Sequence, residues 1–204
     1  NRFGKIKLVH INVFWTRPQD YYDQGDGWRG TWEFDGGAFM NQASHYVDLI
    51  DWLIGPVERV QAMTSTTRKI EAEDTGVVNI KWRNGALGSM AVTMLTYPKN
   101  LEGSITILGE TGSVKIGGVA VNEIQTWDFE VAKDYDETIK SANYQTKSVY
   151  GVGHPIYYKN VIDVMRGVCE PETDGRAGLK SLEALTAIYL AARDGTSVGL
   201  PLHY

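Results

Sequence analysis

Three side chains that can exchange or orient a proton recur at the spacing of a helical turn: Asn41, His45 and Asp48. Offsets of four and three residues place side chains on one stripe of a helix, which Trp52 continues. Histidine suits acid–base work because its unperturbed pKa lies near neutral pH. The stripe predicts an acid–base histidine placed by Asn41 and oriented by Asp48; the alternative is a surface histidine satisfied by a neighbouring carboxylate.

A metal site is the weaker interpretation of this stripe. His45 and Asp48 could both reach one ion, but no third ligand is evident, and zinc sites take three or four protein ligands. The single cysteine, Cys169, excludes an internal disulfide and a thiolate cluster. We therefore expect no metal and, from the cysteine usage, a reducing compartment such as the cytoplasm.

A long polar and aromatic stretch, residues 19–34, precedes the stripe. Unpatterned loops of this length are uncommon in compact domains and are often functional. Arg17 lies just before this loop and Arg29 within it, and a planar guanidinium suits phosphate and carboxylate groups. We expect the two arginines to bind an anionic ligand; the alternative is two ordinary surface arginines.

The elements that must position these residues follow an α+β pattern. A helix is predicted over residues 36–54, with Asp35 as its cap. Further helices are predicted at 155–167 and 177–194, and strands at 6–15, 57–68, 75–82, 87–96, 102–108, 113–116 and 121–129. Asn84-Gly85 predicts a two-residue hairpin turn. The fold class is α+β: one large, open, mostly antiparallel sheet with helices on one face.

Two apolar surfaces are expected to be covered. In the helix at 155–167, the candidate buried positions are Ile156, Val161, Ile162 and Met165. The strand at 87–96 is apolar on both faces, and helices on one side of a sheet leave the other side to be buried. We therefore expect a homodimer or homotetramer formed through the open sheet face.

The composition of the chain argues against some classes of protein and some classes of partner. The chain has 204 residues, 43% of them hydrophobic and 22% charged, with a formal net charge of -5. There is no basic run, which argues against nucleic acid or an anionic membrane as partner, and no apolar run long enough to span a bilayer. The sequence starts with neither an initiator methionine nor a signal-peptide pattern, so we expect a chain cut at a domain edge.

The stretch Asp35-Gly36-Gly37-Ala38, followed by Asn41, His45 and Asp48, resembles the signature helix of the C-terminal domain of the Gfo/Idh/MocA oxidoreductases. The segment 108–113 resembles the family's hairpin, and residues 182–201 its closing helix and tail. The resemblance covers residues 1–204 and implies a substrate-binding and oligomerisation domain from a longer two-domain chain. It implies NAD as cofactor, bound mainly by an absent Rossmann domain, because this chain has no Gly-x-Gly-x-x-Gly after a strand.

The resemblance also implies roles for individual residues. His45 matches the histidine that contacts the sugar hydroxyl and serves as acid–base or orienting group. The family commonly has an aspartate where this chain has Asn41, and an amide cannot take up a proton as a carboxylate does. Proton removal would then fall to His45, with the lysine of the family's Glu-Lys-Pro motif in the absent domain.

Within the family, residues 13–19, 28–32 and 40–42 look most like the UDP-sugar dehydrogenases of lipopolysaccharide biosynthesis, of the WlbA and WbpB type. These oxidise C3 of UDP-N-acetylglucosaminuronic acid with NAD. The likeness implies five substrate-binding residues: Arg17, Trp28, Arg29, Asn41 and Gln42. The alternatives are a dehydrogenase of inositol or a simple sugar, and a non-catalytic sugar-sensing or assembly module. The chain alone is expected to be inactive.

Overall fold

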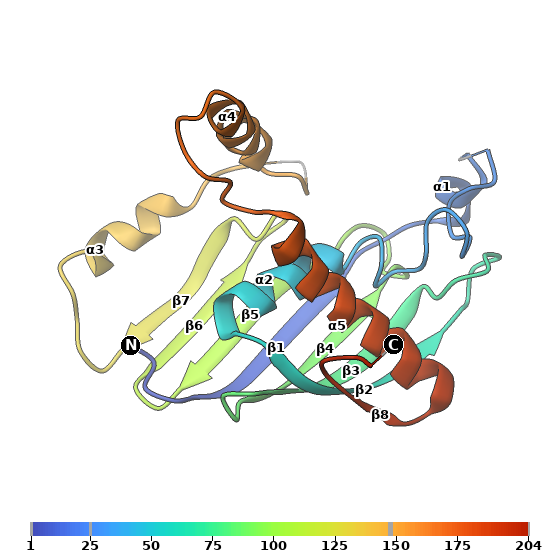
Figure 1. Ribbon diagram of the computed structural model, residues 1–204, viewed down its shortest axis with the longest axis horizontal. Coiled ribbons are helices and arrows are strands. Elements are labelled where there is room, and N and C mark those ends of the chain that lie inside the picture. Colours follow the sequence, from blue (N-terminus) through green and yellow to red (C-terminus); the bar gives the residue numbers. More distant parts are fainter. Residues whose placement is uncertain (1, 25, 147–148, 204) are drawn as a thin grey trace.

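One open sheet organises the described part of the chain, with helices on one side of it (Figure 1). The computed structural model describes residues 2–24, 26–146 and 149–203. The strands are β1 (Ile6–Phe14), β2 (Val57–Ser65), β3 (Thr75–Trp82), β4 (Leu87–Thr93), β5 (Glu102–Gly109), β6 (Gly112–Gly117), β7 (Glu123–Phe129) and β8 (Ser197–Gly199). The helices are α1 (Gln19–Asp23), α2 (Ser44–Ile54), α3 (Asp136–Ile139), α4 (Gly153–Met165) and α5 (Gly175–Asp194), with a 3-10 turn at Lys140–Ala142.

The first strand lies in the middle of the sheet, as its apolar sequence predicts. The strand order is β7-β6-β5-β1-β4-β3-β2-β8, and β1 pairs with β4 in parallel and with β5 antiparallel. The other neighbouring strands pair antiparallel. Val9, Ile11 and Val13 of β1 are fully buried on the helix side. The predicted α+β class with a mostly antiparallel sheet is therefore confirmed.

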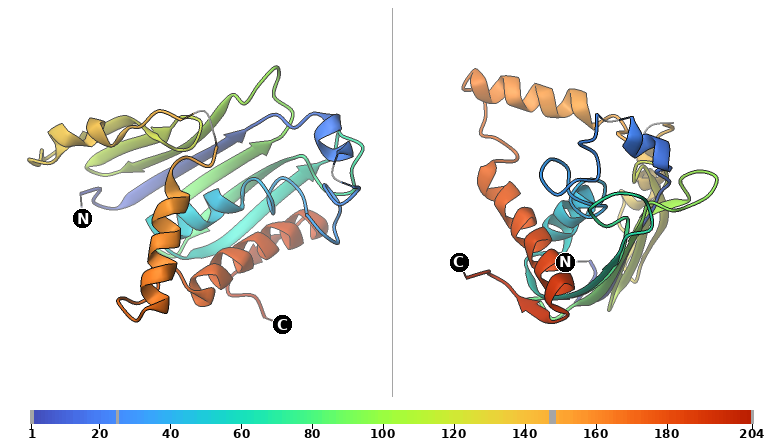
Figure 2. Two further views of the ribbon diagram at one scale, coloured as in Figure 1. Left: turned by 90° about the horizontal axis from the view of Figure 1, so that it is seen from above. Right: turned by 90° about the vertical axis from the view of Figure 1, so that its right-hand side faces the viewer.

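Helices α2 and α5 cover one face of this sheet, and Figure 2 shows both on the same side of it. Their inward residues are aliphatic at helical spacing, including Ile50 of α2 and Ile188 of α5, and they meet the buried side chains of the sheet such as Met90 and Trp82. Removing this apolar area from water is the main favourable contribution to the fold.

The opposite face of the sheet carries a row of exposed leucines. Leu8 of β1 lies in register with Leu87 of β4 on one side and with Leu108 of β5 on the other. Their side chains are 45%, 55% and 36% exposed, in the same order. Three leucines across three neighbouring strands form a contiguous apolar strip that no element of the described chain covers.

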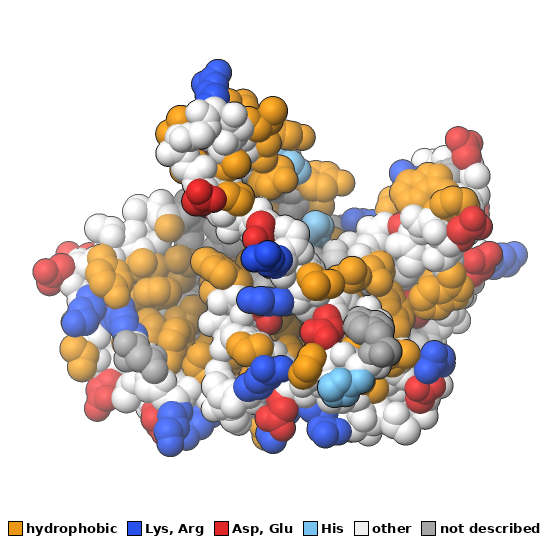
Figure 3. All heavy atoms as spheres, viewed as in Figure 1, with side chains coloured by type: hydrophobic (Ala, Val, Ile, Leu, Met, Phe, Trp, Pro, Cys, Tyr) orange, Lys and Arg blue, Asp and Glu red, His pale blue; other side chains and the backbone are white. Residues whose placement is uncertain are grey.

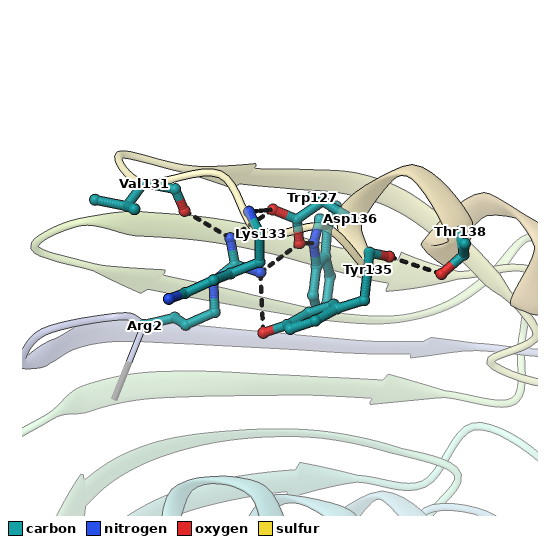
Figure 4. Close-up of polar contacts among 7 residues, drawn as sticks. All are labelled: Arg2, Trp127, Val131, Lys133, Tyr135, Asp136 and Thr138. Atoms are coloured by element: carbon teal, nitrogen blue, oxygen red, sulfur yellow. Dashed lines mark hydrogen bonds and ion pairs between the residues drawn. The ribbon is translucent and has the colours of Figure 1, made fainter.

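A cation–aromatic cluster ties the amino-terminal end to the far edge of the sheet (Figure 4). The Arg2 guanidinium forms two hydrogen bonds with the Asp136 carboxylate and lies 3.9 Å from the centroid of the Phe129 ring. Trp127 of β7 donates its indole N–H to the same carboxylate at 2.8 Å. This arrangement fixes α3 against β7 and holds the pKa of Asp136 well below its usual range, chiefly through the hydrogen bond from Arg2.

The predicted helix at 36–54 is wrong in its first half. α2 begins only at Ser44, its N-cap is Ala43, and Asp35 is not the cap. Residues 38–42 form turns in which Gln42 N–H donates to the Ala38 carbonyl, as in a helix, but Ala43 N–H donates to the same carbonyl. Because two successive N–H groups share one carbonyl, the chain has one extra residue at Ala43 and the helical register is broken there. The polar stripe from Asn41 to Trp52 therefore crosses a bend.

The burial predicted for the helix at 155–167 is also wrong. α4 exists, at Gly153–Met165, but none of its described side chains is buried. Ile156 is 65% exposed and Met165 is 82% exposed. Figure 1 shows α4 standing away from the sheet, and in the space-filling view apolar side chains gather on it (Figure 3). The apolar pattern is present, but no described element lies against it.

Three smaller differences concern chain turns. The hairpin between β3 and β4 has a three-residue loop, because Trp82 N–H pairs with the Ala86 carbonyl, and only Gly85 has positive φ. The loop at 19–34 begins with the short helix α1, and the tail at 197–199 adds β8 to the sheet. Residues 130–150, for which the sequence predicts no helix, contain α3 and the 3-10 turn.

Candidate active site and substrate-binding region

The glycine-containing segment before α2 is held from two sides. The Glu73 carboxylate, from the connection between β2 and β3, accepts a hydrogen bond from Phe39 N–H at 2.9 Å. The Tyr189 hydroxyl, from α5, accepts from Met40 N–H at 3.0 Å. Residues 36–43 do not form a regular helix, so these two N–H groups lack helical partners, and the contacts with Glu73 and Tyr189 satisfy them. Two distant parts of the chain therefore fix the backbone that leads to Asn41.

Burial makes Glu73 an unusual carboxyl group. It is 4% exposed, and burial raises its pKa above the ordinary value, although hydrogen bonds from Phe39 and Tyr189 oppose the shift. A Cβ on Gly37 would lie 1.9 Å from Oε2 of Glu73, so only glycine leaves room for the carboxylate there. Oε2 itself has no hydrogen-bond partner among the described residues.

Asn41 points its amide toward an acid. The Asn41 carboxamide donates through Nδ2 to Oδ1 of Asp35, and Oδ2 of the same carboxylate accepts from Gly30 N–H at 2.6 Å. The Asn41 backbone carbonyl accepts from the Ser44 hydroxyl at 3.0 Å, at the start of α2. Asp35 thus joins the loop around Gly30 to the segment that enters α2.

His45 lies in the first turn of α2, with its side chain at the edge of a cavity of about 350 Å³. Trp15, Tyr46 and Trp52 also line this cavity. The described residues give the imidazole no hydrogen-bond partner, and Asp48 is exposed and forms no ion pair with it. The imidazole is therefore free to contact a ligand. The Tyr46 hydroxyl is buried without a described partner, and burial raises its pKa.

Arg17 and Arg29 lie against one tyrosine ring. The guanidinium carbons lie 5.3 Å and 4.4 Å, respectively, from the centroid of Tyr21 in α1. Each also donates to a backbone carbonyl, Arg17 to Thr16 and Arg29 to Tyr21. Within the described residues neither forms an ion pair with a carboxylate, so two positive charges lie against one ring without an acidic partner.

Trp15 links the arginines to the histidine cavity. The Arg17 guanidinium lies 5.4 Å from the Trp15 ring centroid, and the same indole lines the cavity beside His45. Trp15 also meets Tyr46 edge to face at 6.2 Å. An anionic group of a ligand bound at the arginines and a hydroxyl of the ligand at His45 would then lie on neighbouring sides of the Trp15 indole.

Trp28 and Gln42, the other two predicted substrate-binding residues, differ in how exposed their side chains are. Trp28 is 41% exposed, and the Arg29 guanidinium lies 5.3 Å from its ring centroid. Gln42 is 5% exposed, so little of its side chain is available to a ligand. The structure places Gln42 in the same bend as Asn41, just before the break at Ala43.

Sequence reasoning missed three residues that build this region: Glu73, Tyr21 and Tyr189. Glu73 lies between Ala72 and Asp74, which the structure buries, but no motif or spacing in the sequence marks its carboxylate as a partner for the segment before α2. Tyr189 lies in the helix predicted at 177–194, and nothing local marks its hydroxyl as a partner for a segment 149 residues away.

A second hollow, of about 620 Å³, lies between residues 32–40 and α5. Trp32, Phe34, Asp35 and Tyr189 are among its lining residues. Asp35 thus borders this hollow while its carboxylate holds Asn41. The hollow therefore lies directly beside the segment that leads to His45.

The described residues contain no group of three or more His, Cys, Asp or Glu side chains that could hold a metal ion. No described helix is long and apolar enough to cross a membrane. Rossmann folds bind a dinucleotide where a strand turns through glycines into a helix. Here Trp15, Thr16, Arg17 and Pro18 connect β1 to α1, without a glycine.

Two solved structures are similar to this chain throughout. The WlbA dehydrogenase from Bordetella pertussis, solved with NADH and UDP-GlcNAcA, is 66% identical with a TM-score of 0.94, over 99% of this chain and 58% of that chain. The WlbA dehydrogenase from Chromobacterium violaceum, solved with the same two ligands, is 70% identical with a TM-score of 0.93, over 100% of this chain and 57% of that chain. This chain therefore spans less than two thirds of both.

A more distant structure shares the fold alone. A levoglucosan dehydrogenase solved with NADH and levoglucosan is 19% identical with a TM-score of 0.80, over 99% of this chain and 60% of that one. Among curated proteins, no sequence relative was found. Residues 1–200 match the family model described as "Oxidoreductase family, C-terminal alpha/beta domain" (GFO_IDH_MocA_C). The sheet, the segment before α2 and these matches together place the chain in the Gfo/Idh/MocA oxidoreductase family, as its C-terminal α/β domain.

Proposed function

We propose that residues 1–204 are the substrate-binding and oligomerisation domain of a longer, cytoplasmic, NAD-dependent dehydrogenase that oxidises C3 of UDP-N-acetylglucosaminuronic acid in lipopolysaccharide sugar biosynthesis. The observation that carries this proposal is the identity of 66% and 70% to two WlbA dehydrogenases solved with NADH and UDP-GlcNAcA, over nearly the whole chain. The remaining length of the parent protein binds NAD, which supplies the hydride acceptor.

His45 is the acid–base residue in this proposal. Oxidation of a secondary alcohol removes a hydride from carbon and a proton from the hydroxyl oxygen. The His45 imidazole, which no described residue engages, accepts that proton as the C–O bond becomes a carbonyl. The cavity beside it, lined by Trp15, Tyr46 and Trp52, offers an apolar surface to the sugar ring.

Arg17 and Arg29 bind the anionic parts of the substrate, with Trp28 beside them. Two guanidinium groups that lie on Tyr21 without carboxylate partners match a ligand that carries a diphosphate and a carboxylate. Asn41 contacts the sugar from the bend before α2, with the buried Gln42 beside it in the same bend. The charge pairing favours a nucleotide sugar over a neutral sugar, because a neutral ligand would leave both cations unpaired.

The exposed leucine strip supports assembly through the open sheet face. Leu8, Leu87 and Leu108 lie side by side on it, and apolar strips of this kind commonly mark subunit interfaces. A homodimer or homotetramer formed there leaves the opposite face, with His45, accessible to substrate.

Calorimetric titration of UDP-N-acetylglucosaminuronic acid into the full-length protein with NAD tests the proposal. Binding of the UDP-sugar, and turnover that falls when His45 is replaced by Ala while NAD binding persists, would support it. Equal binding of free glucuronic acid or inositol would favour the simple-sugar alternative. UDP-sugar binding without turnover by the wild type would favour the non-catalytic alternative.

A further inference from the structure

The carboxylate of Asp35 accepts hydrogen bonds from two donors, and this fixes the direction in which the Asn41 carboxamide points. Its Oδ2 accepts from Gly30 N–H at 2.6 Å and its Oδ1 accepts from Nδ2 of Asn41. The backbones on both sides are also tied: Asp35 N–H donates to the Thr31 carbonyl at 3.2 Å, and Asn41 N–H donates to the Gly37 carbonyl at 2.9 Å. Neither side chain can turn without breaking these contacts.

The chemistry of the two groups decides which end of the amide faces outward. An ionised carboxylate accepts hydrogen bonds and donates none, whereas a carboxamide has a donor end and an acceptor end. Asp35 must therefore take the NH₂ end of Asn41, which leaves Oδ1 of Asn41 as the unengaged acceptor. A hydroxyl on a substrate can donate to that oxygen, as it would to a carboxylate.

We propose that Asp35 is a positioning residue that holds the Asn41 carboxamide with its oxygen toward the substrate hydroxyl, so that Asn41 acts as an uncharged hydrogen-bond acceptor in the bend before α2, four residues before His45. This inference rests on the proposed function. It explains how the amide replaces the carboxylate common at this position in the family. An amide oxygen accepts the hydroxyl without adding negative charge beside an anionic ligand, where a second carboxylate would repel it.

A swap of the two groups in the full-length enzyme tests the proposal. The variants are Asp35→Asn, Asn41→Asp and the double variant with both changes, with Glu33→Gln as control. Glu33 is exposed in the same turn and its carboxylate forms no described hydrogen bond or ion pair. The measurement is kcat/KM for the UDP-sugar as a function of pH, together with thermal unfolding to show that each variant folds.

Each variant has a distinct expected result. Asp35→Asn lets the Asn41 amide adopt either orientation and lowers kcat/KM about tenfold, a loss of about 1.4 kcal/mol. Asn41→Asp places two carboxylates side by side, lowers activity at neutral pH and adds an ionisation to the pH profile, because one of the two pKa values rises. The double variant restores a donor–carboxylate pair and is more active than Asn41→Asp alone, but it stays below the wild type because its carboxylate faces the anionic ligand. Glu33→Gln matches the wild type.

Two results would overturn the proposal. One is Asp35→Asn with kcat/KM within about twofold of wild type. The other is a double variant no more active than Asn41→Asp alone. If the wild type does not turn over the UDP-sugar, the proposed function fails instead. The side-chain NH₂ signals of Asn41 in NMR spectra then still decide whether Asp35 fixes the amide: slow solvent exchange that Asp35→Asn abolishes supports the orientation, and fast exchange in the wild type rejects it.

Discussion

The hydroxyl of Tyr189 donates a hydrogen bond to Oε1 of Glu73 at 3.0 Å, across 116 residues of sequence. The same hydroxyl accepts from Met40 N–H, and the same carboxylate oxygen accepts from Phe39 N–H. One side chain from α5 and one from the β2–β3 connection therefore form a single support beneath the segment that carries Asn41. Burial raises the pKa of Tyr189 and that of Glu73 above their ordinary values.

Replacing Gly37 by Ala should destabilise the protein by roughly 2–4 kcal/mol, because the new methyl group would overlap Oε2 of Glu73 and displace the support. Urea unfolding measures the change. Gly178→Ala is the matched control: Gly178 lies in α5, where an added Cβ meets no atom within 4 Å, and the substitution should stabilise by about 0.5–1 kcal/mol. Equal effects at the two positions would contradict the crowding argument.

Replacing Glu73 by Gln should reduce the pH dependence of the free energy of unfolding above the ordinary glutamate pKa. The folded-state pKa of Glu73 lies above its unfolded value, so the folded state binds the proton more tightly. The wild type therefore loses stability as pH rises above the ordinary glutamate pKa of about 4.5, and the variant does not. Unfolding free energies measured from about pH 4 to pH 8 should diverge in favour of the variant. Parallel curves would show that Glu73 titrates normally.

Replacing Arg17 or Arg29 by Gln should weaken UDP-sugar binding by the full-length protein about tenfold or more, because each charged hydrogen bond contributes about 1.5–3 kcal/mol. Calorimetry against the UDP-sugar and against a neutral sugar separates charge recognition from general damage. Arg59→Gln is the control, since Arg59 lies exposed on β2 and contacts Ser197. An equal loss for the neutral sugar would argue against an anion-binding role.

Replacing Leu8 by Glu should dissociate an assembly formed through the open sheet face, since a charge would enter the middle of the leucine strip. Light scattering after size-exclusion chromatography gives the mass in solution. Lys99→Glu, in an exposed loop after β4, changes charge away from the strip and should leave the mass unchanged. A wild-type protein that runs as a monomer would remove the basis of the prediction.

Much of the sheet could be predicted because its information is local. The strand at 75–82 has the predicted bounds, and alternation marks Val78 and Ile80 as inward. The histidine, Asn41 and both arginines were also identifiable, since their residue types and their place beside glycines and a long loop are visible in the chain. The roles assigned to them stay predictions until the variants above are measured.

The errors arise where long-range contacts decide the structure. Residues 36–43 keep a helical apolar pattern, but Glu73 and Tyr189 take the backbone hydrogen bonds that a helix would use, so the turn is not helical. The apolar pattern of α4 correctly predicted a helix and incorrectly predicted burial. Such a pattern shows which face of a helix is apolar, but it does not show whether another part of the same chain packs against that face.

The position of β1 in the sheet has a consequence for how the chain folds. β1 ends at Phe14, but its two partners, β4 and β5, begin only at Leu87 and Glu102. During synthesis this central strand has no partner until most of the sheet has left the ribosome, and its apolar residues stay available to chaperones or to other chains in the meantime. Such distant pairing also slows folding, because the loop must close before the strands can pair.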